Sequence, residues 1–232
     1  MPMMNVSVIA TTIRAVRSAA TEVGESYEVI VVDDASSYGV AAVVETADAR
    51  VVGAELRQIA GARNAGAAVA RGDILVFVDA DMVISAAAVR GAVEAISCGA
   101  VGGGSAVAFD EPTPAYVKLF VPLILWFYRR LRLAGGCFLF CTRQAFQAVG
   151  GFAERMFAAE EVAMSLALRK QGRFVILRDA VVTSGRKLRT YSGWEILGTM
   201  IRLALGGPRA LRDRSRLEMW YGPRRKDPSS AA

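Results

Sequence analysis

Two acidic side chains, Asp79 and Asp81, follow the apolar segment Ile74–Val78 and are the residues of this chain best suited to chemistry. Side chains two residues apart on an extended segment point the same way, so these carboxylates would lie close together and repel each other. A hard divalent cation such as Mg²⁺ or Mn²⁺ prefers oxygen ligands and relieves that repulsion. The apolar segment is typical of a buried parallel strand, and such sheets bind ligands at the carboxyl ends of their strands. The pattern predicts a metal site that holds a diphosphate; taken alone, it is also compatible with a solvated turn.

Two further acidic pairs stand at the boundaries of predicted elements. Asp33 and Asp34 follow a predicted strand at 27–32, where a carboxylate can accept an N–H of a nucleobase or simply form a turn. Glu160 and Glu161 lie at the start of a predicted helix at 159–171. A carboxylate there can accept a proton from a substrate hydroxyl, or it can complement the helix dipole.

The composition excludes several classes of catalysis. The 232 residues contain no histidine, which rules out Ser-His-Asp and Cys-His catalysis and histidine metal sites within this chain. The three cysteines form no disulfide framework, which fits a reducing compartment, and we predict a cytoplasmic location. Acid–base work therefore falls to carboxylates, Lys, Tyr or Cys.

Charge is distributed unevenly along the chain. Residues 1–128 hold 8 Lys/Arg and 14 Asp/Glu, whereas residues 129–232 hold 20 and 8. The acidic half suits a metal and a nucleotide, and the basic half calls for an anionic partner or a membrane surface. The longest apolar run, 119–128, contains Pro122 and is far shorter than the roughly 20 residues of a membrane span. We therefore expect peripheral contact with an anionic membrane, at its inner face, or a homodimer interface, and no nucleic-acid binding.

Alternating strands and helices through the first hundred residues predict an α/β fold with a mostly parallel sheet flanked by helices. The strands are expected at 5–10, 27–32, 49–53, 74–78 and 101–109, and the helices at 14–23, 40–47, 59–70 and 86–96, the last capped by Ser85. Gly102, Gly103 and Gly104 are expected to form a plain turn. Beyond residue 110 we expect helices at 115–133, 143–149 and 159–171, strands at 137–141, 174–177 and 180–183, and an amphipathic tail from 194 to 211.

Five segments in order resemble the motifs of family 2 glycosyltransferases, which have the GT-A fold. They are VSVI at 6–9 with Thr11 and Thr12, VVDDAS at 31–36, GARNAG at 61–66 before GDILVFVDAD at 72–81, GGF at 150–152, and Glu160-Glu161. The sequence departs from the family pattern at Thr11 (usually Pro), at Ala35 (usually Gly) and at Glu160-Glu161 (usually Glu-Asp). The histidine that many relatives carry after the last strands is absent, and Arg186 and Lys187 lie in that region.

The resemblance implies a metal-dependent, inverting glycosyltransferase that moves a sugar from a nucleotide-diphosphate donor to an acceptor hydroxyl. It implies a divalent ion, Mg²⁺ or Mn²⁺, on Asp79 and Asp81, and it makes Glu161 the general base, with Glu160 beside it. The nucleotide would contact the following residues: Thr11, Thr12, Asp33, Asp34, Arg63, Asn64 and Asp79. Phosphate or acceptor contacts would come from Gly135, Gly136, Arg186 and Lys187.

The expected organisation is a catalytic domain at 1–190 and a basic, amphipathic extension at 191–232. Within the domain, 1–110 would bind nucleotide and metal, and 111–190 would bind the acceptor, a lipid-linked or cell-envelope glycan. Two alternatives stay open on the residues alone. One is a non-catalytic sugar-nucleotide-binding or scaffold protein with this fold, and the other is a nucleotidyltransferase, although no Gly-rich basic loop follows the first predicted strand.

Overall fold

The computed structural model describes residues 21–22, 26–35, 49–110, 113–135 and 138–222. The predicted strand at 5–10, the helix at 40–47 and most of the helix at 14–23 lie outside these residues. The same holds for three predicted site residues: Thr11, Thr12 and Gly136.

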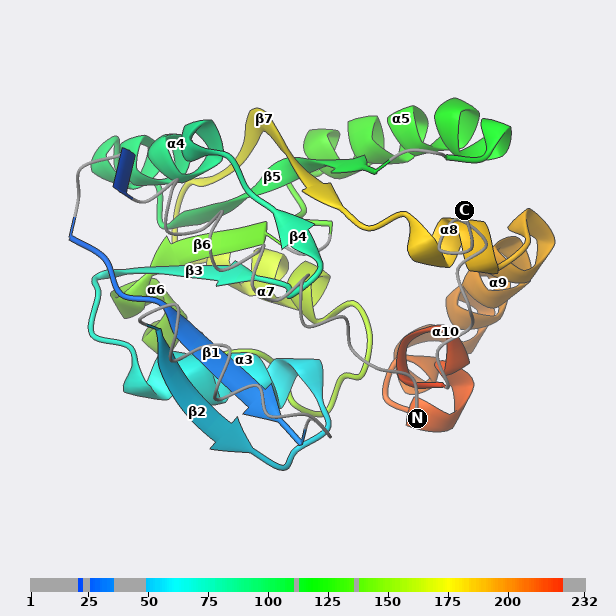
Figure 1. Ribbon diagram of the computed structural model, residues 1–232, viewed down its shortest axis with the longest axis horizontal. Helices are drawn as coiled ribbons and strands as arrows, with labels where there is room; N and C mark the ends of the chain where they lie inside the picture. Colours follow the sequence, from blue (N-terminus) through cyan, green and yellow to red (C-terminus); the bar gives the residue numbers. More distant parts are fainter. Residues whose placement is uncertain (1–20, 23–25, 36–48, 111–112, 136–137, 223–232) are drawn as a thin grey trace.

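The described strands form two sheets (Figure 1). The smaller one pairs β1 (Ile30–Asp34) in parallel with β2 (Arg50–Ala54), and α3 (Ile59–Val69) packs against both. The larger one has the strand order β3-β6-β5-β7-β4. Its strands are β3 (Ile74–Val78), β4 (Met82–Val83), β5 (Gly102–Phe109), β6 (Phe138–Thr142) and β7 (Phe174–Thr183).

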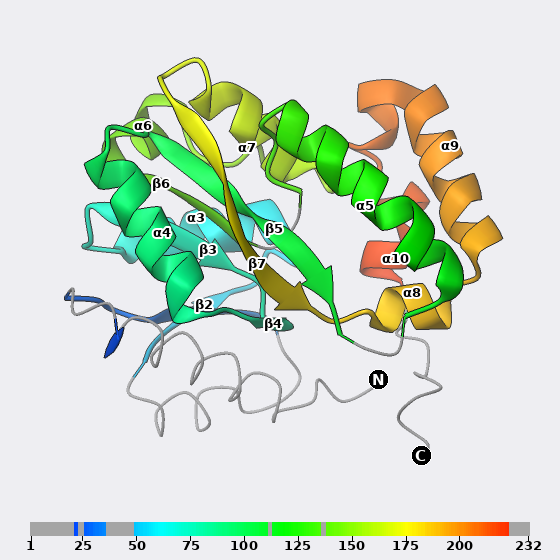
Figure 2. The same ribbon diagram turned by 90° about the horizontal axis from the view of Figure 1, so that it is seen from above.

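The main sheet is mixed, so the expectation of a mostly parallel sheet was wrong. β6 is inserted between β3 and β5 and runs antiparallel to both, β5 and β7 are parallel, and β4 is antiparallel to β7. The helix between β5 and β6, α5 (Ala115–Arg130), extends away from the sheet (Figure 2). β6 therefore enters the sheet in the direction opposite to β5 rather than through a parallel crossover.

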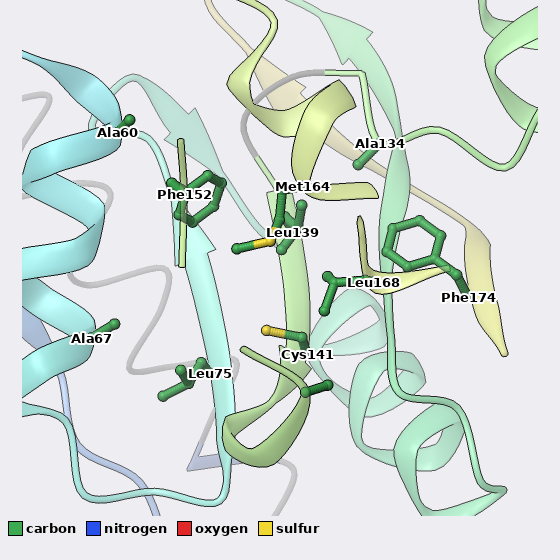
Figure 3. Close-up of a cluster of buried hydrophobic side chains, with 11 residues drawn as sticks. Ala60, Ala67, Leu75, Ala134, Leu139, Cys141, Phe152, Met164, Leu168 and Phe174 are labelled. Carbon is green, nitrogen blue, oxygen red and sulfur yellow. The ribbon is translucent and has the colours of Figure 1, made fainter. Parts of the chain in front are cut away.

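Helices cover both faces of the main sheet and build a core on each side. α4 (Ala86–Ser97) packs on one face, where the alternating side chains Phe138 and Phe140 of β6 point. On the other face, Leu139 and Cys141 of β6 meet α3, α6 (Arg143–Ala148) and α7 (Glu160–Leu168), as Figure 3 shows. The expected cap of α4 is confirmed, because the Ser85 hydroxyl accepts a hydrogen bond from Ala88 N.

Three glycines expected to form a turn lie instead inside β5. A Cβ atom at Gly103 would come within 2.4 Å of the Val175 carbonyl oxygen and 2.5 Å of the Phe140 ring. Glycine is needed because this central strand lies close to its neighbours on both sides. The two strands expected at 174–177 and 180–183 form the single strand β7, with a register shift opposite Ser105 and Ala106.

The chain ends in a group of helices at one end of the molecule, away from β1 and β2 (Figures 1 and 2). They are α8 (Arg186–Thr190), α9 (Gly193–Ala210), the 3₁₀ turn η1 (Arg214–Arg216) and α10 (Glu218–Tyr221). Among the described residues, no helix combines the length and the apolar character needed to cross a membrane.

Candidate active site

One cation, the guanidinium of Arg63 on α3, binds three carboxylates from two other parts of the chain. Its Nη2 donates to Asp79 Oδ1 at 2.7 Å and to Glu161 Oε1 at 2.9 Å, and its Nη1 donates to Glu160 Oε1 at 3.1 Å. Asp79 follows β3, and the two glutamates begin α7. We call Arg63, Asp79, Glu160 and Glu161 the carboxylate cluster. It brings the two acidic motifs of the sequence into one site.

The orientation of Arg63 is fixed by an aromatic ring. The guanidinium carbon lies 5.2 Å from the centre of the Phe152 ring, a cation–π arrangement. Phe152 is buried and packs edge-on against Phe77 of β3, with 4.9 Å between ring centres. The side chain of Phe152 also joins the core between α3 and the main sheet, where Figure 3 shows it beside Ala60. The Arg63 side chain is 10% exposed, so its ion pairs are shielded from water.

Asn64, the next residue on α3, positions the loop that carries Phe152. Its Oδ1 accepts from Phe152 N at 2.8 Å, and its Nδ2 donates to Phe152 O at 3.0 Å and to Glu154 Oε1 at 2.8 Å. Both protons of the amide group are therefore used within the protein. The structure gives Asn64 a positioning role, and the nucleotide contact expected of it stays a prediction.

The Asp34 carboxylate, at the end of β1, holds the loop that leads into α3. Its Oδ1 accepts from Leu56 N at 2.6 Å and Arg57 N at 2.7 Å, and its Oδ2 accepts from Gln58 N at 2.8 Å. Gln58 is the residue before α3, so Asp34 satisfies amide groups at the start of the helix that carries Arg63. Its neighbour Asp33 also lies on β1, opposite Gly53 of β2. Nucleotide contacts of Asp33 and Asp34 stay predictions.

Ala35 shows why glycine is usual at this point of the motif. Its φ is 59°, in the left-handed region, and its amide donates to Ala54 O at 2.9 Å. An alanine in this conformation costs about 1 kcal/mol relative to glycine. Ala159, the residue before Glu160, also has a φ of 59°, so the acidic pair of α7 is introduced by a second left-handed residue.

The donor atoms of Asp79 and Asp81 fit a divalent cation. Asp81 is open to solvent, yet its pKa is raised, first because protein atoms displace water around the carboxyl and second because Asp79 is negatively charged. A cation between the two carboxylates would remove this repulsion. Among the described residues, no third Asp, Glu, Cys or His joins them as a metal-ligating group.

The carboxylate cluster has perturbed proton affinities. Burial and the charge of Glu161 raise the pKa of Glu160 to about 7, although Arg63 opposes the shift. Burial by itself would lower the pKa of Arg63, but the charges of Asp79, Glu161 and Glu160 outweigh it and raise that pKa. The guanidinium thus remains charged, whereas Glu160 titrates near neutral pH.

Glu161 lies near enough to Tyr128, in the part of the chain expected to bind the acceptor, to influence its pKa. Burial, followed by the charge of Glu161, raises the pKa of Tyr128 on α5. The Tyr128 ring lies against Gly135, where an added Cβ would be 2.4 Å from Tyr128 Cδ1. Glu161, Tyr128 and Gly135 thus form a neighbourhood beside the carboxylate cluster. Glu160 is 4% exposed and lies on the inner side of the pair.

Two basic residues of α8, Arg186 and Lys187, lie near Asp81, and the phosphate or acceptor contacts expected of them stay predictions. Both lower the pKa of Asp81, against the effects of burial and Asp79. Lys187 Nζ lies 5.6 Å from the centre of the Trp220 ring on α10. The structure therefore brings positive charge to the place where a diphosphate would meet Asp81.

Tyr221, on α10, lies near the carboxylate cluster although no motif predicted it. Its ring packs edge-on against Phe157 at 5.7 Å and lies under Arg214 at 5.0 Å. Burial, followed by the charge of Glu160, raises its pKa. The one feature of the sequence that could have drawn attention to Tyr221 is its place beside Trp220 in a basic segment. That pattern does not show that the segment folds back onto α7.

Comparisons with known proteins found one matching family and several solved structures of similar fold. Residues 1–152 match the family Glycosyl transferase family 2, and no curated protein matches the chain. The mannosyltransferase PcManGT from Pyrobaculum calidifontis, solved with GDP-Man and Mn2+, has a TM-score of 0.63 at 18% identity, over 91% of this chain and 62% of its own. This chain therefore spans less than two thirds of that structure.

Two further solved structures share the fold. Mannosyl-3-phosphoglycerate synthase from Rubrobacter xylanophilus has a TM-score of 0.60 at 20% identity, over 91% of this chain and 72% of its own. Glucosyl-3-phosphoglycerate synthase from Mycobacterium tuberculosis, solved with Mn2+, uridine-diphosphate and phosphoglyceric acid, has a TM-score of 0.57 at 17% identity, over 94% of this chain and 76% of its own. At these identities the likeness shows a shared GT-A fold.

Proposed function

Since this chain belongs to glycosyl transferase family 2, whose members transfer a sugar from a nucleotide-sugar donor, we propose that it is a metal-dependent, inverting enzyme acting on an acceptor hydroxyl. The observation that carries the proposal is the carboxylate cluster. Arg63 binds Asp79 of the donor motif and Glu161 of the acceptor motif with the same nitrogen, at 2.7 and 2.9 Å. The two motifs are thus close enough to act on the two sides of one reacting carbon.

The donor diphosphate would lie beside Asp79 and Asp81. A divalent ion held by these carboxylates would supply electrostatic stabilisation of the negative charge that develops on the leaving diphosphate. Arg186 and Lys187 lie close enough to influence Asp81 and would add positive charge on the same side. They would take the place of the histidine that this chain lacks.

The acceptor hydroxyl would be deprotonated by Glu161. In the transfer step, the acceptor oxygen forms a bond to the anomeric carbon while the bond from that carbon to the diphosphate oxygen breaks. The electron pair of the broken bond leaves with the diphosphate, and the hydroxyl proton goes to Glu161. A single displacement of this kind inverts the anomeric centre. Glu161 suits the role because its side chain is less buried than that of Glu160, at 15% against 5% exposed.

Arg63 would restrain Glu161 before the acceptor binds. A carboxylate that is hydrogen-bonded to a fixed guanidinium keeps its position, as a general base must. Glu160, buried on the inner side of the pair, would support Arg63 rather than touch the substrate. We propose a glycan or lipid-linked acceptor, which the apolar exposed side of α5, the helix that carries Tyr128, supports.

A donor screen tests the proposal. GDP- and UDP-sugars would be incubated with the protein in Mn²⁺, in Mg²⁺ and in EDTA, and release of nucleotide diphosphate would be measured. We expect turnover or slow donor hydrolysis with at least one donor, and only with metal. Formation of a nucleoside triphosphate and a sugar phosphate from the donor and added pyrophosphate, which marks nucleotidyl transfer, would contradict the proposal, as would metal-independent activity.

A further inference from the structure

We propose that the exposed apolar sides of α5 and α9 form one docking surface for an anionic lipid bilayer. Six large apolar side chains of α5 are between 51% and 71% exposed: Leu119, Phe120, Leu123, Ile124, Trp126 and Phe127. Five on α9 are between 42% and 84% exposed: Trp194, Leu197, Met200, Ile201 and Leu205. Water-exposed groups of this size mark an interaction surface. We call these eleven residues the apolar face.

The side chains of the apolar face follow the helical repeat. On α9, Trp194, Leu197, Ile201 and Leu205 are spaced by three or four residues, so they lie along one side of the helix. On α5 the exposed residues occupy one broad side, while Leu125, on the opposite side, packs against the core cluster that contains Phe138 and Phe140. Each helix therefore presents an apolar side outward rather than scattering apolar residues around its surface.

Both helices lie at the same end of the molecule. Figures 1 and 2 place α5 and α9 together at the end opposite β1 and β2. A surface that contacted both helices at this end would leave the nucleotide half of the sheet free. Helices of this kind rest in the boundary between lipid headgroups and acyl chains rather than crossing the bilayer.

The charges beside the apolar face identify the partner. The segment 115–132 contains Lys118, Arg129, Arg130 and Arg132, all exposed, and no acidic residue. The segment 193–212 contains three exposed arginines, Arg202, Arg209 and Arg212, against a single acidic residue, Glu195. Anionic headgroups would neutralise this excess, and each basic residue near such a surface adds to the attraction.

The same charges argue against a second copy of the chain. A two-fold dimer brings the same patch of each subunit together, so it would place the basic residues of one copy against those of the other. Like charges facing each other across an interface oppose association. An anionic bilayer offers both an apolar layer for the eleven side chains and opposite charge for the arginines.

The docking also has a geometric link to the proposed active site. The segment that follows α5 is joined to α7 by hydrogen bonds, since Ala134 N donates to Ser165 Oγ at 3.0 Å and that hydroxyl donates to Glu161 O at 2.8 Å. A bilayer that held α5 would thus lie on the acceptor side of the carboxylate cluster. The docking itself does not depend on the proposed reaction, so its test needs no substrate.

Co-sedimentation of the full chain with vesicles tests the inference. Neutral phosphatidylcholine vesicles would be compared with vesicles that contain phosphatidylglycerol, at low and at high salt. We expect the protein in the pellet only with the anionic vesicles, and at least tenfold weaker partitioning at high salt, because ions screen the arginines. Equal recovery in the supernatant with and without anionic vesicles at low salt would overturn the inference.

Matched variants locate the surface. Leu123→Gln with Trp194→Ser removes two side chains of the apolar face that are 63% and 83% exposed, so the fold should be retained. We expect at least tenfold weaker partitioning for this variant and for Arg130→Ser with Arg209→Ser. The controls are Tyr27→Ser, which removes an exposed ring at the opposite end, and Arg71→Ser with Arg90→Ser, which removes two exposed charges.

Two outcomes would overturn the assignment. One is vesicle binding that the face variants leave unchanged, or that the control variants weaken equally. The other is a combination of two results. The unmodified chain does not bind vesicles, and light scattering shows that it is a dimer which Leu123→Gln with Trp194→Ser converts to a monomer. Donor hydrolysis in solution should be unchanged in these variants, which separates failure of the docking from failure of the proposed reaction.

Discussion

Asp79 and Glu161 accept hydrogen bonds from the same nitrogen atom, Nη2 of Arg63, at 2.7 and 2.9 Å. These residues come from the donor motif after β3 and the acceptor motif at the start of α7. A single buried cation therefore sets the separation between the group proposed to hold the leaving diphosphate and the group proposed to take the acceptor proton.

Replacement of Arg63 by Gln should strongly destabilise the protein. The substitution leaves three carboxylates without their counter-ion in a site where the side chain is 10% exposed, and breaking a buried ion pair costs about 3–5 kcal/mol. Urea unfolding without metal would measure the change in the free energy of unfolding. Mn²⁺ should restore part of the loss, because a divalent cation can neutralise Asp79.

The control for Arg63 is Arg90→Gln. Arg90 pairs with Glu22 at 3.4 Å, and the two side chains are 47% and 63% exposed. Exposed ion pairs contribute about 0–1 kcal/mol, so this variant should unfold almost as the unmodified protein does. Equal effects of the two substitutions would show that the carboxylate cluster needs no counter-ion.

Asp81→Asn should separate metal binding from folding. Without metal the variant should be at least as stable as the unmodified protein, because Asn removes the charge that burial and Asp79 make unfavourable. Its affinity for Mn²⁺ in the presence of a nucleoside diphosphate should fall by about two orders of magnitude or more, since a metal ligand is lost. Calorimetry measures that affinity. Unchanged binding would remove Asp81 from the metal site.

Glu160 should make the stability of the metal-free protein fall as the pH rises. Its pKa is raised from 4.5 to about 7, so the folded state binds this proton more tightly than the unfolded state does. The stability that this tighter proton binding gives the folded state is fully present below pH ~4.5 and is lost as the pH rises through ~7. Its size is of the order of 1–3 kcal/mol. Free energies of unfolding at pH 5 and pH 8 would measure it.

The variant Glu160→Gln cannot titrate, so its stability should depend less on pH than that of the unmodified protein over this range. Glu94→Gln on the exposed side of α4 serves as the control and should keep the original dependence. If Glu160→Gln keeps the same slope between pH 5 and pH 8, another group causes it.

The sequence predicted local elements better than their arrangement. β3 was found at its observed bounds because an apolar run ends sharply at Asp79, and α4 was found from the cap at Ser85. Local patterns do not state which strands pair, so the antiparallel entry of β6 was missed. Gly103 was mistaken for a turn residue, because the contacts that exclude a side chain come from Val175 and Phe140, far along the chain.

For the site too, the sequence predicted individual residues better than their arrangement in space. Motifs drew attention to Asp79, Asp81 and Glu161, and the structure brings Asp79 and Glu161 together on Arg63. The role of Arg63 as a bridge was not predictable, since Arg63 and Glu160 are 97 residues apart and an arginine on a helix usually faces solvent. The return of Tyr221 to the neighbourhood of Glu160 likewise depends on tertiary packing alone.

Turnover by Glu161→Gln tests the central claim most directly. The substitution keeps the size of the side chain and a hydrogen-bond acceptor for Arg63 but removes the basic group. With the donor and metal identified by the screen, we predict a roughly 10²–10⁴-fold drop in transfer rate, with donor binding unchanged by calorimetry. Glu160→Gln should retain far more activity. Full transfer activity in Glu161→Gln, alongside an inactive but folded Glu160→Gln, would contradict the account.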